Sequence, residues 1–260
     1  MMGKGWRHVK HTVQIEEAIT ELSLNWLVGD VRLYHHDHPY LLMKQTTNHV
    51  FPHRYLLHHQ VQEGRLVIQD KRKRAISLGL HLHQTNLEIY LPQAQLQSLS
   101  IHCKGANLFL DGLKVKEANC QLISGKSMFT GEIKHLRLQT VGGLISSQQL
   151  NTQTLSLRTT SSKVEMVGAF SDIDLNLIGR RVQIHSKAML HSLKSTSTGS
   201  SVKVAIPEND GFICYVKKRS GTFHNDFPCF DDQDRMVYKN GGKSFEVDIR
   251  GGSFLLSDGH

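Results

Sequence analysis

The sequence predicts an all-β protein, built as a single-stranded parallel β-helix or β-solenoid-like stack of short strands with an N-terminal antiparallel hairpin region. Three observations predict this fold: a spaced pair of apolar residues recurs along the chain, short segments alternate apolar and polar residues, and glycine and serine fill the breaks. Alternation with a period of two is typical of half-buried strands. Small residues suit the turns between strands, because they adopt turn conformations and permit close stacking.

The repeat consists of two apolar residues seven positions apart, and one serine alone breaks the apolar rule. The pairs are Leu24/Val31, Ile101/Leu108, Leu122/Phe129, Leu138/Ile145, Leu157/Val164, Leu175/Val182, Ser195/Val202, Val216/Phe223 and Val247/Phe254. Between Ile101 and Ser195, successive units begin about 19 residues apart. Two short strands and two turns cannot form a core alone, so the units are expected to stack and bury a continuous one. An antiparallel sandwich would give similar local signals and is the alternative fold.

The chain is expected to contain one elongated domain. Residues 1–16 form a lead-in and residues 17–256 form the domain, in which 17–94 supply the first unit and the hairpins, and 95–256 supply the stacked units. The segment Thr12–Leu22 suits either a short capped helix or extended chain, and the extended form is favoured. Open strand edges at the ends of a solenoid need a cover. We expect the N-terminal hairpins to cover one end, and the C-terminal strand or self-association to close the other.

Composition excludes two classes of protein. With 39% hydrophobic and 21% charged residues over 260 positions, the chain is too apolar to be disordered and too polar to lie in a membrane. No apolar run of signal-peptide length follows Met1, and no segment approaches the ~18 apolar residues of a spanning helix. A cytoplasmic protein is therefore expected, with surface association left open. The four cysteines lack metal-like spacing and are expected to be free, mostly buried thiols, with Cys120 and Cys214 facing inward.

The net charge of +8 suggests an anionic partner. A candidate anion-binding patch on turns between strands comprises Lys71, Arg72, Lys73, Arg74, Arg180, Arg181, Lys217, Lys218 and Arg219. The first four could contact phosphates, but a solvated hairpin tip that discourages edge pairing is the favoured interpretation. No aromatic residues are interleaved with this run for base stacking, so no specific nucleic-acid partner is expected.

Histidine is concentrated in one region. Nine of the 17 histidines are His35, His36, His38, His49, His53, His58, His59, His81 and His83. Strand alternation would place His36 and His38 on the same face of a strand, and likewise His81 and His83. Such side chains can bind a transition metal where three or four converge, or respond to pH near 6.5. A solvated face is the favoured interpretation, and no metal site or cofactor is predicted.

No motif for catalysis is present in the sequence. It lacks GxSxG, HExxH and a phosphate-binding glycine-rich loop. The acidic run at 231–234 lacks the glycine and the terminal glutamate of a calcium-binding loop. We therefore predict no catalytic residue.

Several segments resemble the bacterial "putative adhesin" domain family, whose members repeat strand–Ser-Gly-Asp–strand units. Residues 24–31 are similar to its opening unit, residues 64–71 to its hairpin strand, and residues 87–92 to the strand that leads into the solenoid; residues 205–212 are the most family-like stretch. The acidic residue that often follows Ser-Gly in the family is replaced here by Asn107, Leu144, Lys163, Arg181 and Ser201. The resemblance implies a solenoid domain without assigned enzymatic activity.

The repeat and the resemblance together favour a non-enzymatic binding or scaffold module linked to the bacterial cell envelope or its stress response. A protein or an anionic envelope polymer is the expected partner, and association of copies through the solenoid ends is left open. The first alternative is a cytosolic His-rich protein that responds to metal or pH. The second is a polysaccharide-active β-solenoid enzyme, which rests on analogy of fold alone.

Overall fold

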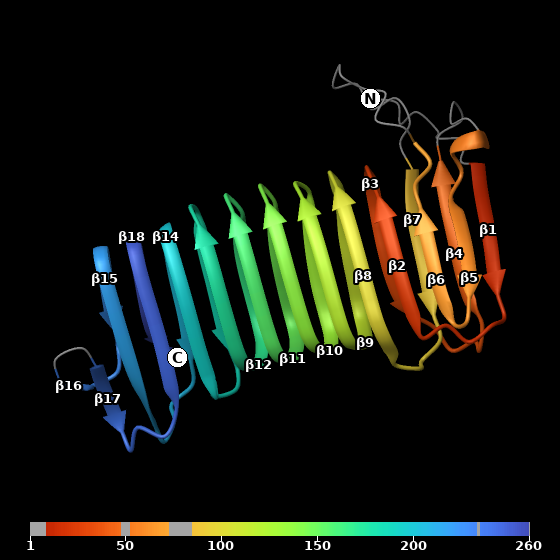
Figure 1. The fold of residues 1–260 in the computed structure, drawn as a ribbon. Helices are drawn as coiled ribbons and strands as arrows, with labels where there is room; N and C mark the ends of the chain where they lie inside the picture. Colours follow the sequence, from red (N-terminus) through yellow and green to blue (C-terminus); the bar gives the residue numbers. More distant parts are fainter. Residues whose placement is uncertain (1–8, 48–52, 73–84, 233–234, 260) are drawn as a thin grey trace, which may run out of the picture.

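The computed structural model describes residues 9–47, 53–72, 85–232 and 235–259. Within these ranges 18 strands belong to one sheet, which coils into a long, flat stack (Figure 1). The middle of the stack consists of β8 (Leu96–Lys104), β9 (Ala106–Ile123), β10 (Lys126–Val141), β11 (Leu144–Thr160), β12 (Lys163–Ile178), β13 (Arg181–Ser186) and β14 (Ser192–Ile206). These strands pair in parallel, which confirms the predicted solenoid and excludes the antiparallel sandwich.

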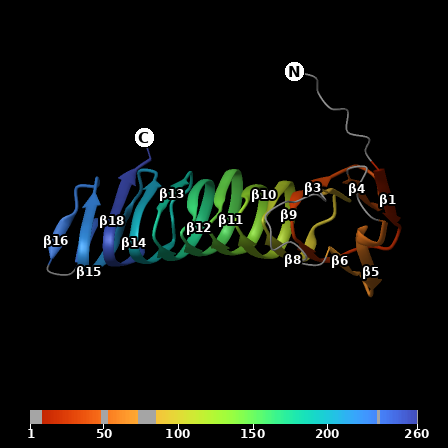
Figure 2. The same cartoon turned by 90° about the horizontal axis from the view of Figure 1, so that it is seen from above.

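The long strands bend once, so that each contributes to two layers of the stack (Figure 2). We call the layer of strand halves that follow a turn face A, and the layer of halves that precede a turn face B. The turns align along one edge, the turn edge, which runs along the top of Figure 1. Small residues permit these turns, because Gly142, Ser161 and Gly179 all have positive φ, at 70°, 53° and 65°.

Inward side chains form continuous columns through the stack, because parallel register repeats the same position on each strand. On face B, one column consists of Leu24, Ile101, Cys120, Leu138, Leu157, Leu175, Ser195, Val247 and Val216. On face A, the matching column consists of Val31, Leu108, Ser127, Ile145, Val164, Val182, Val202, Phe254 and Phe223. The spacing of seven therefore joins two stacked columns across each turn.

One predicted pair occupies a different position. The columns contain Cys120 and Ser127, not Leu122 and Phe129, although the spacing of seven is kept. The turn of this unit is accordingly Ser124–Gly125, two residues earlier than the pair predicts. All four side chains are buried. Leu122 and Phe129 occupy the next inward positions, two residues after Cys120 and Ser127, and so they show the same spacing of seven.

The N-terminal strands cover one end of the stack. They are β1 (Val9–Ile15), β2 (Glu21–Trp26), β3 (Gly29–His35), β4 (Leu41–Thr47), β5 (His58–Gln62), β6 (Arg65–Gln69) and β7 (Thr85–Leu91), with a short 3-10 turn, η1, at His53–Tyr55. Strands β2 and β3 stack directly on β8 and β9. Beyond them lie β6 and β7, which carry the antiparallel strands β5 and β4. The extended form of Thr12–Leu22 is confirmed, since this segment includes parts of β1 and β2.

The C-terminal end does not follow the order of the chain. It contains β15 (Gly211–Asn225), β16 (Phe230–Asp232), β17 (Arg235–Lys239) and β18 (Ser244–Asp258). Strand β18 inserts between β14 and β15 and pairs in parallel with both. The expected closure of this end by the C-terminal strand is therefore wrong, because β15 is the last strand of the stack. The antiparallel strand β17 pairs with β15 only over Gly211–Tyr215.

Three cysteines are free thiols within the core. Cys103, Cys120 and Cys214 are buried, as the inward positions of the last two predict. Burial raises the pKa of Cys103 and of Cys214 to about 12, and it raises that of Cys120 as well. These thiols therefore stay protonated and act as small apolar side chains.

Replacing Gly252 with alanine is expected to destabilise the protein more than the same change at Gly199. Both glycines lie on the turn edge with positive φ, at 86° and 62°, so both variants carry the left-handed penalty of about 1–2 kcal/mol. A Cβ at Gly252 would lie 2.0 Å from the carbonyl oxygen of Ser200, whereas one at Gly199 meets open space among the described residues. Urea denaturation should show at least twice the loss for Gly252→Ala. Equal losses would contradict the backbone contact.

Candidate functional site

The structure separates the candidate anion-binding residues into three places along the stack. Lys71 and Arg72 follow β6, Arg180 lies in the turn between β12 and β13, and Lys217 lies in β15. From β6 to β12 the ladder takes six steps, which span about 29 Å. These residues do not form one patch. Lys73 and Arg74 lie outside the described residues.

Arg72 is engaged inside the protein rather than exposed at a hairpin tip. Its guanidinium pairs with the Asp70 carboxylate, and the two side chains are only 9% and 2% exposed. Arg72 Nη2 donates a hydrogen bond of 2.7 Å to the carbonyl oxygen of Val28, and the guanidinium carbon lies 5.7 Å from the centroid of the Trp26 ring. Asp70 also accepts a hydrogen bond of 3.1 Å from the amide of Leu27. Arg72 therefore anchors the segment after β6 to the turn after β2.

Arg180 and Arg181 occupy the middle of the turn edge. Arg180 has a φ of 55°, and Arg181 opens β13 opposite Ser201. Both side chains are exposed, and Lys163 lies on the neighbouring strand of face A. Two cations in one turn and a third beside them give a small positive site.

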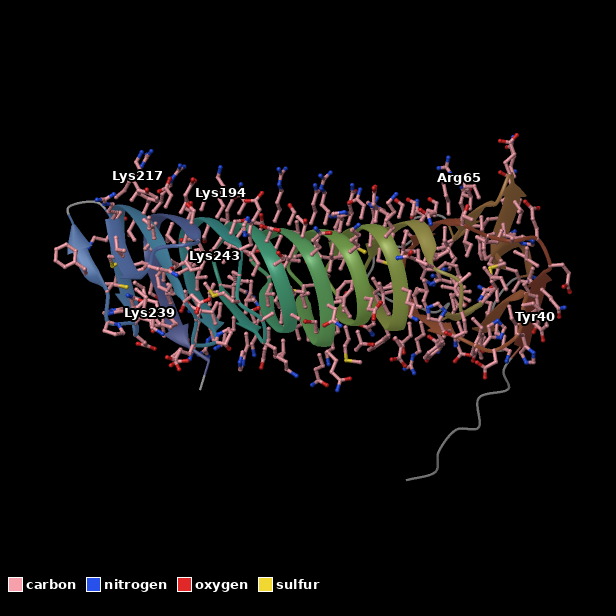
Figure 3. All side chains as sticks on the ribbon, turned by 90° about the horizontal axis from the view of Figure 1, so that it is seen from below. Tyr40, Arg65, Lys194, Lys217, Lys239 and Lys243 are labelled. Carbon is pink, nitrogen blue, oxygen red and sulfur yellow. The ribbon has the colours of Figure 1, made fainter. Side chains whose placement is uncertain are left out.

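The third group borders a shallow groove of about 830 Å³ on face B, over the last three strands of the stack. Its outward side chains come from β14, β18 and β15 in that spatial order, and they are Lys194, Thr196, Glu246, Asp248, Tyr215 and Lys217. Register places Glu246 between Lys194 and Tyr215, and Asp248 between Thr196 and Lys217. Figure 3 shows Lys194 and Lys217 on the same side of the molecule, near the end formed by β15.

The groove has more cations than carboxylates. Lys218 also lines the groove, and Arg219 and Arg250 adjoin it. Asp174 of β12 lies opposite Lys194, so that five exposed cations meet the three carboxylates of Glu246, Asp248 and Asp174. Arg250 Nη2 donates a hydrogen bond of 3.0 Å to Asp248 Oδ2. That hydrogen bond lowers the pKa of the Asp248 carboxyl, and the charges of Arg250, Arg219 and Lys217 lower it further. Asp248 therefore stays ionised and orients Arg250, while the surplus of positive charge can attract an anion.

Two of the five cations are not part of the sequence-based patch. Lys194 and Arg250 stand alone in the sequence, without a basic neighbour, and so give no local charge signal. Only the insertion of β18 between β14 and β15 brings them together with Lys217. The repeat does predict that Lys194 points outward. Ser195 belongs to the inward column of face B, and the residue before it on a strand points to the opposite side.

The histidine region divides between two environments. His36 and His38 follow β3 in a loop, not in a strand as predicted, but their rings still lie side by side with centroids 5.2 Å apart. His38 stacks on Tyr40 at 5.1 Å. His35 Nδ1 contacts the carbonyl oxygen of Pro92 at 2.8 Å, while the amide of Lys114 donates to His35 Nε2 at 3.1 Å. Those two contacts require the neutral tautomer with its proton on Nδ1.

The other described histidines are not grouped into a metal site. Burial lowers the pKa of His59, and the charges of His58 and His11 lower it further, so this ring is neutral at pH 7. In the part of the chain that the structure describes, no three His, Cys, Asp or Glu side chains are placed to hold a metal ion. His49, His81 and His83 lie outside the described residues.

Comparisons with known proteins establish the relationship. The family model Toastrack DUF4097 matches residues 19–250. A "putative adhesin" of known structure from Parabacteroides distasonis ATCC 8503 is 13% identical, with a TM-score of 0.62 over 96% of this chain and 97% of that chain. A "putative lipid binding protein" from the same organism is 13% identical, with a TM-score of 0.55 over 95% of this chain and 96% of that one. Identities this low establish the fold alone.

A third solved structure extends the comparison to another species. A "putative adhesin" from Parabacteroides merdae ATCC 43184 is 10% identical, with a TM-score of 0.56 over 95% of each chain. Among curated proteins, none matches this sequence. None of the described segments forms a helix with the length and apolar character needed to cross a membrane.

Proposed function

Because this chain belongs to the Toastrack family, we propose that it is a non-enzymatic binding module whose groove over β14, β18 and β15 holds an anionic polymer. The observation that supports this proposal is the surplus of cations in and beside the groove, where five basic side chains meet three carboxylates. The similarity to proteins described as adhesins and as lipid-binding agrees with a binding role. The expected setting is the bacterial cell envelope or its stress response.

The groove suits a polymer that carries repeated phosphates. Lys194 and Lys217 lie on strands two ladder steps apart, which is about 10 Å, with β18 between them. Because a sheet holds its side chains on a rigid frame, several weak contacts can form together without reorganisation of the backbone. Each contact at an exposed cation is modest and is screened by salt. Affinity is therefore expected to depend on the number of phosphates and on ionic strength.

Reversing two charges in the groove is expected to weaken the binding of polyphosphate by about 10- to 100-fold at low salt. The variant Lys194→Glu/Lys217→Glu changes both sides of the groove and leaves the buried columns intact. The slope of log affinity against log salt concentration should also fall by about two, because two cations no longer pair with phosphates. Fluorescence anisotropy with labelled polyphosphate, at salt concentrations of about 50 and about 200 mM, measures both the affinity and its dependence on salt.

The matched control is Arg180→Glu/Arg181→Glu, which makes the same change in net charge at the middle of the turn edge. It should retain most of the affinity, because these arginines lie on the turn edge and do not line the groove on face B, although Arg181 is next to Ser201 of β14. Equal weakening by both double variants would mean that net charge alone attracts the polymer, and would overturn the groove as the site. Vesicles of anionic and of zwitterionic lipid, compared with soluble polyphosphate, distinguish a lipid headgroup from a free phosphate polymer as the source of the anion.

A further inference from the structure

The last strand of the stack is only half covered. Strand β17 pairs with the outer edge of β15 over Gly211–Tyr215, and the described strands leave the outer edge beyond Tyr215 unpaired. On its inner side, β15 continues to pair with β18 as far as Asn225. The backbone N–H of Ile213 points toward that inner side, since it donates to the carbonyl oxygen of Lys243 at 2.7 Å. By alternation, the N–H of Val216 points outward, along the open edge.

The core is also half covered at this end. In the covered half, Phe212 is fully buried against Phe227 and Tyr238, with ring centroids 5.3 and 5.4 Å away. In the other half, Val216 and Phe223 occupy the same inward columns as every preceding strand but remain partly exposed. The ring of Phe223 stacks on that of Phe254 of β18 with centroids 5.8 Å apart, on its inner side. The open edge thus combines unpaired backbone groups with two apolar side chains.

The charges on the edge favour one kind of occupant. Three consecutive cations, Lys217, Lys218 and Arg219, lie on the open stretch of β15 and are exposed. Lysines on an edge strand discourage pairing with another edge like it, because like charges approach as the strands meet. A second copy of this chain would bring six cations together. An extended segment with carboxylates would satisfy the backbone edge and neutralise the cations at once.

We propose that an extended acidic peptide adds to the outer edge of β15 as one further strand of the solenoid. Its apolar side chains would cover Val216 and Phe223, and its carboxylates would face Lys217 and Arg219. The turns stack closely at this edge, since a Cβ added to Gly221 would lie 2.4 Å from the carbonyl oxygen of Gly252 on the preceding strand. By the same stacking, the peptide would need a small residue opposite Gly221. This inference goes beyond the polymer groove, although Lys217 borders both surfaces.

The test uses the whole chain and a synthetic peptide of about ten residues that alternates glutamate and valine around a central glycine. We expect the peptide to bind, and we expect N-methylation of its alternate amides on one edge to weaken binding at least tenfold. N-methylation removes main-chain donors without changing the charge of the peptide or the protein. A peptide with lysine in place of glutamate should not bind.

Variants of the protein provide the second arm. Val216→Pro removes the outward N–H and should weaken the acidic peptide at least tenfold, whereas Val216→Ala keeps the N–H and should have a smaller effect. Equal affinity for the methylated and unmethylated peptides, or no binding of either, would overturn strand addition. Polyphosphate binding in the same samples separates the two proposals. If peptide binding is absent but polyphosphate still binds, strand addition is wrong and the proposed groove is unaffected. Concentration-dependent dimers in sedimentation that Val216→Pro dissociates would also overturn the proposal, by assigning the edge to a second copy.

Discussion

Replacing Arg72 with alanine is expected to lower the free energy of unfolding by about 3–5 kcal/mol. The Asp70 carboxylate is only 2% exposed, and Arg72 is its charged partner. Removing the guanidinium would leave the buried carboxylate with two amide donors but no cation, and the carbonyl oxygen of Val28 without its 2.7 Å donor. The loss is large because it reflects a stranded charge, not the modest net contribution of an ion pair.

Urea denaturation of Arg72→Ala beside Lys71→Ala measures this effect. Lys71 is the adjacent basic residue and is exposed, so its removal should change stability by no more than about 0.5 kcal/mol. Because Trp26 lies under the guanidinium, its fluorescence should also change in Arg72→Ala. A loss for Arg72→Ala as small as that of Lys71→Ala would mean that the segment after β6 is not anchored to the turn after β2.

Replacing Phe212 with alanine is expected to cost about 3–5 kcal/mol, because it removes a large aromatic side chain from the core. Phe212 is fully buried, and its ring centroid lies 4.8 Å from that of Phe245 and 5.3 Å from that of Phe227. The damage should be local. A stack of repeated strands is coupled mainly between neighbours, so the end can open while the middle remains folded.

Hydrogen exchange distinguishes local opening from a uniform loss of stability. In Phe212→Ala, amides of β15, β17 and β18 should lose protection, while those of β10 and β11 keep theirs. The matched control is Phe230→Ala, because Phe230 lies in the same end of the molecule but is 74% exposed. Its replacement should change stability by about 0.5 kcal/mol or less. Uniform loss of protection across the stack would contradict an independently opening end.

The sequence predicts the solenoid well because each turn imposes the same spacing on the two columns. The pair Leu138/Ile145 identifies both an inward leucine on face B and an inward isoleucine on face A. The same rule misplaces one pair, because the core accepts the small side chains of Cys120 and Ser127 where a larger apolar pair lies two residues on. Apolar character marks the inside of a strand, but it does not identify which inward residue meets which neighbour.

The order of the last strands could not be predicted from the repeat. Val216/Phe223 and Val247/Phe254 have the same spacing, and small residues lie between the members of each pair, so neither is marked as the terminal pair. Their order depends on the segment between them, whose aromatic residues pack on β15 and place β17 along part of its outer edge. That choice is made by tertiary contacts, which a local pattern does not contain.

The candidate site was predicted in part for the same reason. Lys217, Lys218 and Arg219 form a run that is visible in the sequence, and the structure places them beside the groove. Lys194 and Arg250 join them only through the register of β14 and β18. Arg72 was predicted wrongly, because a run of basic residues indicates a solvated hairpin tip, whereas its side chain is buried against Asp70. Its burial depends on Trp26 and Val28, which are distant in sequence.

The insertion of β18 has a consequence for the order in which the protein can be assembled during translation. The ribosome synthesises β15 before β18, yet β18 is the strand that joins β15 to the rest of the sheet. A nascent chain that has reached Asn225 therefore lacks β18, the strand that pairs in parallel with β15 in the folded protein. The valine, phenylalanines and cysteine of this strand can reach their native packing only after about thirty further residues have been synthesised and β18 has docked. The end of the solenoid is thus completed in one late step rather than strand by strand.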